Sequence, residues 1–110
     1  MFLLAAVALA TPVPKSDAQI EYEALLPIAM VNYRTCLTLK TDYYAKTEET
    51  VATVVDAAFG ACSEDRATLS ALPKKVGLNV SVESHERQLA WIDEQERKRL
   101  TPFVIDLRTK

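Results

Sequence analysis

Two cysteines and a single histidine are the residues of this sequence with the most distinctive chemistry. Cys36 and Cys62 stand too far apart for the C-x-x-C spacing of redox and zinc sites. His85 cannot complete a four-ligand zinc site with them. A Ser–His–Asp or Cys–His nucleophile would have to use His85, which stands in the charged stretch 83–87. We therefore expect no catalytic residue, no metal and no cofactor, and we interpret His85 as a solvated or half-buried structural side chain.

Acidic residues are the next candidates for chemistry. Catalytic carboxylates or a cation site could be built from two groups: Glu48 with Glu49, and Asp93 with Glu94 and Glu96. Neighbouring acids on a helix point in different directions, which is poor geometry for sharing a proton or a metal. We therefore interpret these acids as helix-capping and solvated side chains.

One basic triplet and one sequon complete the candidate sites. Arg97-Lys98-Arg99 could bind an anionic lipid or another polyanion. Cations are also favoured at the C-terminus of a helix, and this structural interpretation is the one we favour. Asn79-Val80-Ser81 is a glycosylation sequon, which matters only in a glycosylating pathway, and we treat it as a chance match.

The overall charge and length restrict the class of protein. The chain has 110 residues, with 13 basic and 15 acidic side chains and a net charge of −2. This length has room for one domain. The absence of a basic excess argues against nucleic acid as a partner, and the ordinary apolar content argues against a disordered tail. We expect no small-molecule ligand.

The N-terminus has the composition of an export signal. Residues 1–10 are all apolar and are followed by Thr11-Pro12-Val13-Pro14. This run is too short to cross a bilayer, which needs about 20 residues, but it suits a secretory signal. Small residues at Ser16 and Ala18 predict cleavage after Ala18, with cleavage after Ala10 as the alternative. We predict a signal peptide over 1–18 and one periplasmic or secreted domain over 19–110. A buried N-terminal helix of a cytosolic protein remains the other possibility.

Apolar periodicity predicts an all-α fold. Side chains recur at intervals of three, four or seven on both sides of a turn at 45–50, which is typical of two amphipathic helices. The upstream set is Leu26, Ala29, Met30, Tyr33, Cys36, Leu37, Tyr43 and Tyr44, and the downstream set is Val51, Val55, Ala58, Cys62, Leu69 and Leu72. Pro27 either kinks the first helix or separates a short one, and we favour a kink.

The cysteines predict how these two helices pair. An even cysteine count in a small exported chain indicates a Cys36–Cys62 disulfide. An antiparallel hairpin about the turn brings both cysteines to the same level, with Gly60 and neighbouring alanines as a low surface for close approach. Thr47 is predicted to cap the second helix, which places Glu48 and Glu49 in its first turn.

A third helix is predicted after the linker Pro73–Asn79. It should begin near Ser81 or Ser84 and run to about Leu100, where Thr101-Pro102 breaks or kinks it. Residues 103–107 would then form a short helix or an apolar tail that packs on the hairpin or on a partner. The apolar side of this helix consists of Val82, Leu89, Ile92, Leu100 and Phe103. The solvated side carries pairs in which an acid precedes a base by four residues: Glu83–Arg87, Asp93–Arg97 and Glu94–Lys98.

Two tyrosines beside the turn are candidates for a partner contact. Consecutive helical residues are about 100° apart, so Tyr43 and Tyr44 cannot both be buried. An exposed tyrosine beside a turn is a plausible anchor for another protein.

The cysteine-bearing segments resemble those of a widespread group of small exported bacterial proteins, mostly of unassigned function. The resemblance covers about residues 30–72: Tyr33-Arg34-Thr35-Cys36-Leu37, then Asp56-Ala57-Ala58-Phe59-Gly60-Ala61-Cys62, then Arg66 and Leu69. It implies a location in the bacterial envelope and a disulfide-bridged hairpin, and it brings no catalytic residues.

The expected function is therefore that of a non-catalytic interaction or structural protein of the bacterial periplasm. Its partner would be another envelope protein or a second copy of the chain. The alternative is a small holdase-type chaperone of the periplasm, active at low pH, where the carboxylates lose their charge.

Overall fold

The computed structural model describes residues 13–110, and this part of the chain is entirely helical apart from its connections. Four helices follow one another: α2 (Asp17–Tyr44), α3 (Val51–Ala61), α4 (Ser63–Lys75) and α5 (Val82–Arg108). The all-α prediction is confirmed. The predicted apolar signal region and the alternative cleavage site after Ala10 lie outside the described residues.

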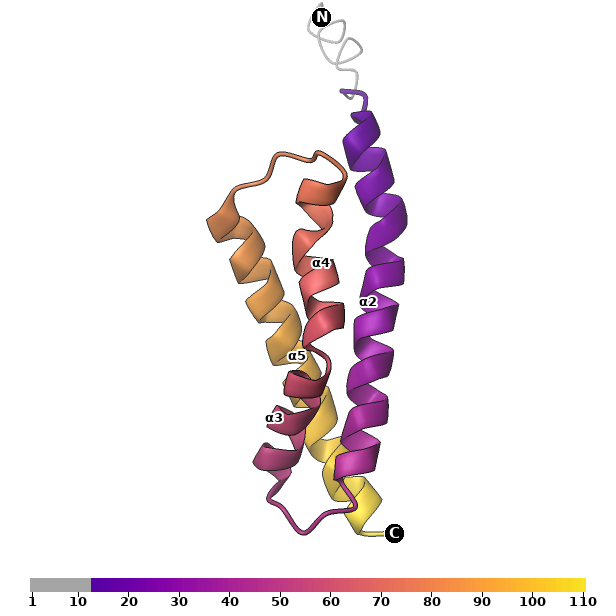
Figure 1. Cartoon of the computed structure of the whole chain (residues 1–110), viewed down its shortest axis with the longest axis vertical. Coiled ribbons are helices and arrows are strands. Elements are labelled where there is room, and N and C mark those ends of the chain that lie inside the picture. The colour runs from indigo at the N-terminus through magenta and orange to yellow at the C-terminus, as the bar shows by residue number, and fades with distance from the viewer. Residues whose placement is uncertain (1–12) are drawn as a thin grey trace, which may run out of the picture.

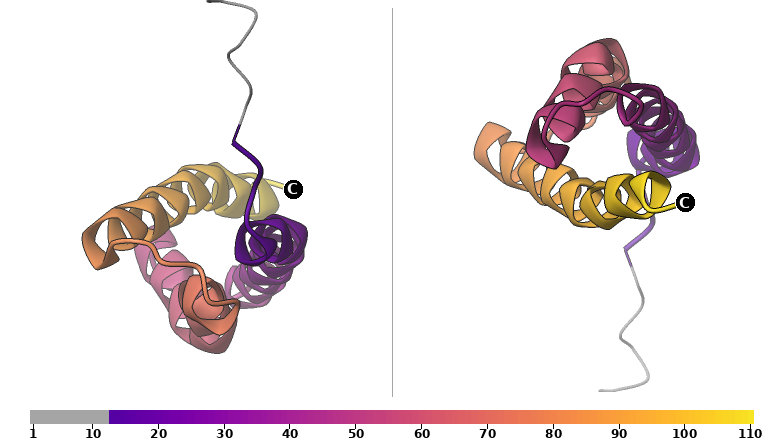
Figure 2. Two further views of the ribbon diagram at one scale, coloured as in Figure 1. Left: turned by 90° about the horizontal axis from the view of Figure 1, so that it is seen from above. Right: turned by 90° about the horizontal axis from the view of Figure 1, so that it is seen from below.

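The helices form a three-sided bundle. α2 runs from one end of the bundle to the other, and α3 followed by α4 returns in the opposite direction (Figure 1). α5 begins beside the end of α4 and ends beside the C-terminus of α2. Viewed along the long axis, α2, α3–α4 and α5 occupy the sides of a triangle (Figure 2), which surrounds one core.

All four helices contribute to that core. Its buried side chains are Ala29, Tyr33, Leu37, Ala45, Val54, Val55, Ala58, Cys62, Leu69, Leu72, Leu89, Ile92, Leu100 and Val104. The predicted faces are therefore largely correct, although Val54 was not predicted to be buried. Val82 was placed on the apolar side but is 72% exposed, because the first turn of α5 lies beyond the core.

The predicted single helix over 51–72 is wrong, because it is divided at Cys62. This residue has φ −104° and ψ 20°, ends α3 and precedes α4. The predicted disulfide with Cys36 is present, with the two Cα atoms 5.9 Å apart. The break in the helix thus lies at the residue that is bonded to α2.

Gly60 does not provide the predicted close approach beside this disulfide. A Cβ atom added at Gly60 would meet no atom within 4 Å, and the residue is exposed. Of the small residues before Cys62, Ala58 is the one that packs, with no exposed surface. Gly60 therefore weakens α3 without a packing benefit.

The cap predicted at Thr47 is also wrong. Thr50 caps α3 by accepting a hydrogen bond of 3.2 Å from the Thr53 amide, and Glu48 and Glu49 lie in the loop before the helix. Thr47 instead donates its hydroxyl proton to the Tyr44 carbonyl at 2.7 Å. The carbonyls at the end of α2 lack intrahelical donors, and Thr47 satisfies one of them.

Pro73 and Pro102 lie near the predicted ends of two helices, but neither helix ends at its proline. α4 continues through Pro73 and ends at Lys75, and the chain then turns at Gly77, whose φ of +78° suits glycine. α5 was predicted to end near Leu100 but continues through Pro102 to Arg108. α2 likewise continues through Pro27.

The C-terminal turns of α5 are held by the rest of the bundle. Val104 is fully buried, and Phe103 and Leu107 pack against the core. Arg108 donates hydrogen bonds to the carbonyls of Ala45 (3.0 Å) and Thr47 (2.8 Å). These contacts explain why the helix extends beyond Pro102, since they stabilise the helical conformation of its last turns.

Removing the disulfide should destabilise the protein strongly. The bond joins residues 26 positions apart, and closing a loop of that size contributes about 3–4 kcal/mol in the chain-entropy model. We expect the double variant Cys36→Ser/Cys62→Ser to lose about this much free energy of unfolding in urea titrations followed by circular dichroism. A loss below about 1 kcal/mol would contradict this estimate.

The two glycines should respond oppositely to alanine. Gly60→Ala should raise the free energy of unfolding by about 0.5–1 kcal/mol, because the added methyl group enters open space and favours the helix. Gly77→Ala should lower it by about 1 kcal/mol, because φ is +78° there. Thermal and urea unfolding of both variants measures the difference, and a stabilised Gly77→Ala would contradict the argument.

Candidate functional site

Residues 13–110 contain neither a membrane-spanning helix nor a metal-binding cluster of side chains. No helix of that range is long and apolar enough to span a membrane. No three or more His, Cys, Asp or Glu side chains within it lie close enough together to hold a metal ion.

His85 joins two helices. Its ring Nε2 donates a hydrogen bond of 2.7 Å to the carbonyl of Ser70 in α4, and the side chain is half-buried. It lines a cleft between α4 and α5 together with Pro73 and Val82. This arrangement agrees with a structural histidine.

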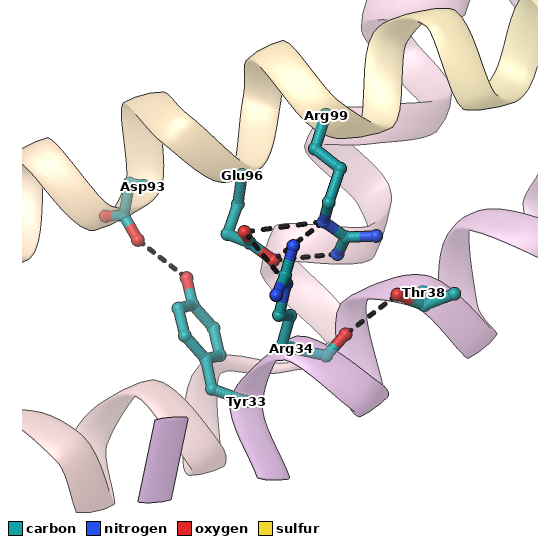
Figure 3. Close-up of polar contacts among 6 residues, drawn as sticks. All are labelled: Tyr33, Arg34, Thr38, Asp93, Glu96 and Arg99. Atoms are coloured by element: carbon teal, nitrogen blue, oxygen red, sulfur yellow. Dashed lines mark hydrogen bonds and ion pairs between the residues drawn. The ribbon is translucent and has the colours of Figure 1, made fainter. Parts of the chain in front are cut away.

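Asp93 is a partner of two other helices rather than a solvated acid. Its Oδ1 accepts a hydrogen bond of 2.7 Å from the Tyr33 hydroxyl in α2, as Figure 3 shows. Its Oδ2 accepts one of 2.8 Å from Nε of Arg66 in α4. The interpretation of Asp93 as a solvated surface acid is therefore wrong, because α2 and α4 supply donors from distant parts of the sequence.

Glu96 lies one turn further along α5, and its interpretation as a solvated side chain is also wrong. Only 8% of the residue is exposed. Its carboxylate accepts hydrogen bonds from Arg99 at 2.7 Å and 3.2 Å, and Arg34 of α2 lies 3.4 Å away (Figure 3). A carboxylate buried to this degree requires such partners. Asp93 and Glu96 thus connect α5 to α2.

The basic triplet is engaged within the molecule and does not lie at a helix end. Arg97 binds Asp56 at 2.6 Å and stacks 4.4 Å over the ring of Phe59. Lys98 pairs with Glu94 at 3.3 Å, whereas the predicted Asp93–Arg97 and Glu83–Arg87 pairs do not form. Because α5 continues to Arg108, the interpretation of the triplet as a helix C-terminus is wrong.

Electrostatics in this central cluster favour the protonated tyrosine. Burial raises the pKa of Tyr33 far above its usual range, and the hydrogen bond to the Asp93 carboxylate adds to the increase. The hydrogen bond to Asp93 also raises the pKa of Arg66. Tyr33 therefore serves as a neutral hydrogen-bond donor that holds α2 against α5. The polar groups of this cluster are hydrogen-bonded to one another.

The two tyrosines at the end of α2 have different surroundings. Tyr43 is 66% exposed, whereas Tyr44 packs partly against the core. Their rings meet edge to face with centroids 5.4 Å apart. Tyr44 thus supports the ring of Tyr43, which remains available on the surface.

The outer face of α2 is the surface feature that the periodicity analysis missed. We use this name for the exposed apolar side chains Ile20, Ile28, Val31, Leu39 and Tyr43, which are 55–66% exposed. They recur at intervals of eight, three, eight and four, so they follow one side of the helix. The core residues Ala29, Tyr33 and Leu37 lie on the opposite side. Counting the intervals between apolar residues on the other side of the predicted helix would have found this second stripe.

A shallow apolar hollow lies in the middle of this outer face. It is lined by Val31, Arg34, Thr35, Thr38 and Leu39, all from α2. The hollow is present because the threonines are short between the larger side chains that flank them. A side chain of another molecule could enter it.

Comparisons with protein-family models, with curated proteins and with solved structures found no match to this chain.

Replacing Tyr33 should alter the dependence of stability on pH. The folded state holds the Tyr33 proton more tightly than the unfolded chain, so the free energy of unfolding should fall as pH rises above about 10. In Tyr33→Phe we expect a loss of about 1–2 kcal/mol at neutral pH and a weaker decline above pH 10. Urea titrations between pH 7 and 11 measure both.

Tyr43→Phe is the matched control, because its ring is exposed. This variant should follow the wild-type pH dependence. An identical decline in Tyr33→Phe and wild type would contradict the role assigned to the Tyr33–Asp93 contact.

Proposed function

We propose that this protein is exported to the bacterial periplasm and acts there, without catalysis, as an interaction protein that binds its partner on the outer face of α2. In this proposal the hairpin of α2 with α3 and α4, joined by the disulfide, is the rigid frame for that face. The observation that carries the proposal is the stripe of apolar side chains between Ile20 and Tyr43, which are more than half exposed.

Burial of apolar surface explains why this stripe suggests binding. Isolated exposed apolar side chains are common, but a continuous row of them is typical of interaction sites. α2 already has a complete apolar side in the core, formed around Tyr33 and Leu37. Its second apolar side has no function within the bundle, so a partner is the simplest reason for it.

The hydrogen bonds made by the polar side chains support a function without catalysis. Asp93, Glu96 and His85 each bind a group on another helix or a neighbouring arginine. Their hydrogen bonds hold the bundle together, so each of these three side chains already has a partner within it. They are thus accounted for as structural groups.

Two features support export. A disulfide persists in an oxidising compartment, and the apolar N-terminal run resembles a secretory signal. Cleavage after Ala18 would remove Ser16, which caps α2, and Asp17 in its first turn. The mature helix would then begin near Gln19 and depend on packing further along α2.

Site-specific cross-linking in living cells tests the proposed surface. A photo-reactive residue at Val31 should give an adduct of one defined mass in the periplasmic fraction, on a chain whose N-terminus is Gln19. Leu39→Glu should reduce this adduct at least tenfold, because a buried charge disrupts an apolar contact. The reactive residue at Gln88, an exposed position on α5, is the control and should give no such adduct. Equal adducts from both positions, or none at Val31, would refute the proposal.

A further inference from the structure

We infer that the disulfide between Cys36 and Cys62 is a redox-sensitive conformational lock, which keeps α3 and α4 separate and whose reduction joins them into one continuous helix over 51–75. This inference goes beyond the proposed function and does not depend on it. Three features carry it: the position of the break between the helices, the buried faces on its two sides, and the open hydrogen-bonding groups beside it.

The break between α3 and α4 consists of a single residue. α3 ends at Ala61 and α4 begins at Ser63, and Cys62 between them has φ −104° and ψ 20°. A regular helix has a ψ of about −42°. Cys62 is only 1% exposed and is bonded to Cys36 of α2. The covalent restraint from α2 therefore acts at the residue where the helix is interrupted.

The core does not require this break. At about 100° per residue, the buried residues before and after the break fall within one sector of about 100° on a single uninterrupted helix. These residues are Val54, Val55, Ala58, Cys62, Leu69, Leu72 and Pro73. A continuous helix would therefore turn the same side chains toward the core, so the burial of apolar surface does not select the interrupted form.

Backbone hydrogen bonding favours the continuous helix. The amides of Ser63, Glu64 and Asp65 lie in the first turn of α4, where amides have no carbonyl of their own helix to bind. The residue before them makes no side-chain capping hydrogen bond to them either. In a continuous helix these amides would donate to the carbonyls four residues earlier, those of residues 59–61. The segment can thus gain three hydrogen bonds once the bond to α2 is broken.

Other groups stabilise the interrupted form, so the two forms differ little in free energy. Glu64 and Asp65 are acids in the first turn of α4, where the helix dipole favours negative charge. Gly60, two residues before the break, weakens a continuous helix and has no atom packed against the place of its missing side chain. A single covalent bond can select between two forms that are balanced in this way. The balance also gives Gly60 a role that its packing does not.

A reductant can reach the disulfide from one side. Cys36 is partly exposed whereas Cys62 is buried, so the thiolate of a dithiol reductant attacks Sγ of Cys36. A new S–S bond forms to Cys36 as the old one breaks, and Sγ of Cys62 leaves with the electron pair and takes up a proton. The second thiol of the reductant then displaces Cys36 in the same way. Both cysteines end as thiols, and the dithiol ends as a disulfide.

Reduction also changes the surface beside the break. A hollow there is lined by residues of α3, α4 and α5, among them Phe59 and Gly60 before the break and Ser63 and Arg66 after it. Because these residues stand on both sides of Cys62, a continuous helix moves them relative to one another. The lock therefore sets the shape of this hollow as well as the course of the two helices.

Amide hydrogen exchange of the purified protein, followed by NMR with and without dithiothreitol, tests the inference. In the oxidised protein the amides of Ser63, Glu64 and Asp65 should exchange rapidly. After reduction their exchange should slow about tenfold or more, because each amide gains a carbonyl partner. The Cα chemical shift of Cys62 should move into the helical range at the same time. The amide of Leu100, a buried residue of α5, reports whether the bundle remains folded.

Two variants serve as controls. Cys36→Ser/Cys62→Ser should show slow exchange at the same three amides without dithiothreitol, and adding the reductant should change nothing. In oxidised Gly60→Ala these amides should still exchange rapidly, since the bond and not the glycine imposes the break.

Two outcomes would overturn the inference. If Ser63, Glu64 and Asp65 exchange rapidly in the reduced protein while Leu100 stays protected, the break is independent of the bond. If reduction removes protection throughout the protein, the disulfide supports the whole fold and does not select between two forms. Neither outcome bears on the Val31 adduct, which tests the proposed function separately.

Discussion

The covalent bond between Cys36 and Cys62 is the constraint on which the rest of this bundle depends. It attaches the middle of α2 to the point where α3 ends and α4 begins, and Cys62 is almost completely buried there. Because the chain is short, one core supplies a limited stabilisation, and a bond that restricts the unfolded state is a large contribution. It also fixes the level at which the buried side of α2 lies against α3 and α4 in the core.

The position of α5 depends on polar contacts. Asp93 and Glu96 bind donors from α2 and α4 in the middle of the bundle, and Arg108 binds the carbonyls that follow α2 at its end. Such contacts are directional, so they specify how α5 lies across an otherwise apolar surface. One buried side-chain oxygen among the described residues, that of Thr41, has no hydrogen-bond partner.

α2 connects the stability of the bundle to its proposed function. One side of the helix belongs to the core and carries the disulfide, while the other side exposes Ile28, Val31 and Leu39. A helix fixed along its length by packing presents an exposed stripe with little conformational freedom. A preorganised surface loses less entropy on binding, so even a modest apolar stripe can bind a partner.

Local signals in the sequence determined the helical class, the cysteine pairing, the buried side of α2 and a start of α5 near Ser81 or Ser84, since periodicity and capping act over a few residues. The break at Cys62, the continuation through Pro102 and the partners of Asp93 and Glu96 were decided by tertiary structure alone. Each of them depends on groups that are distant in sequence: α2 bonds Cys62, the core buries Val104 beyond Pro102, and Tyr33 and Arg34 reach the two acids of α5. A pattern confined to one segment does not contain these contacts, because they form only when the helices pack together.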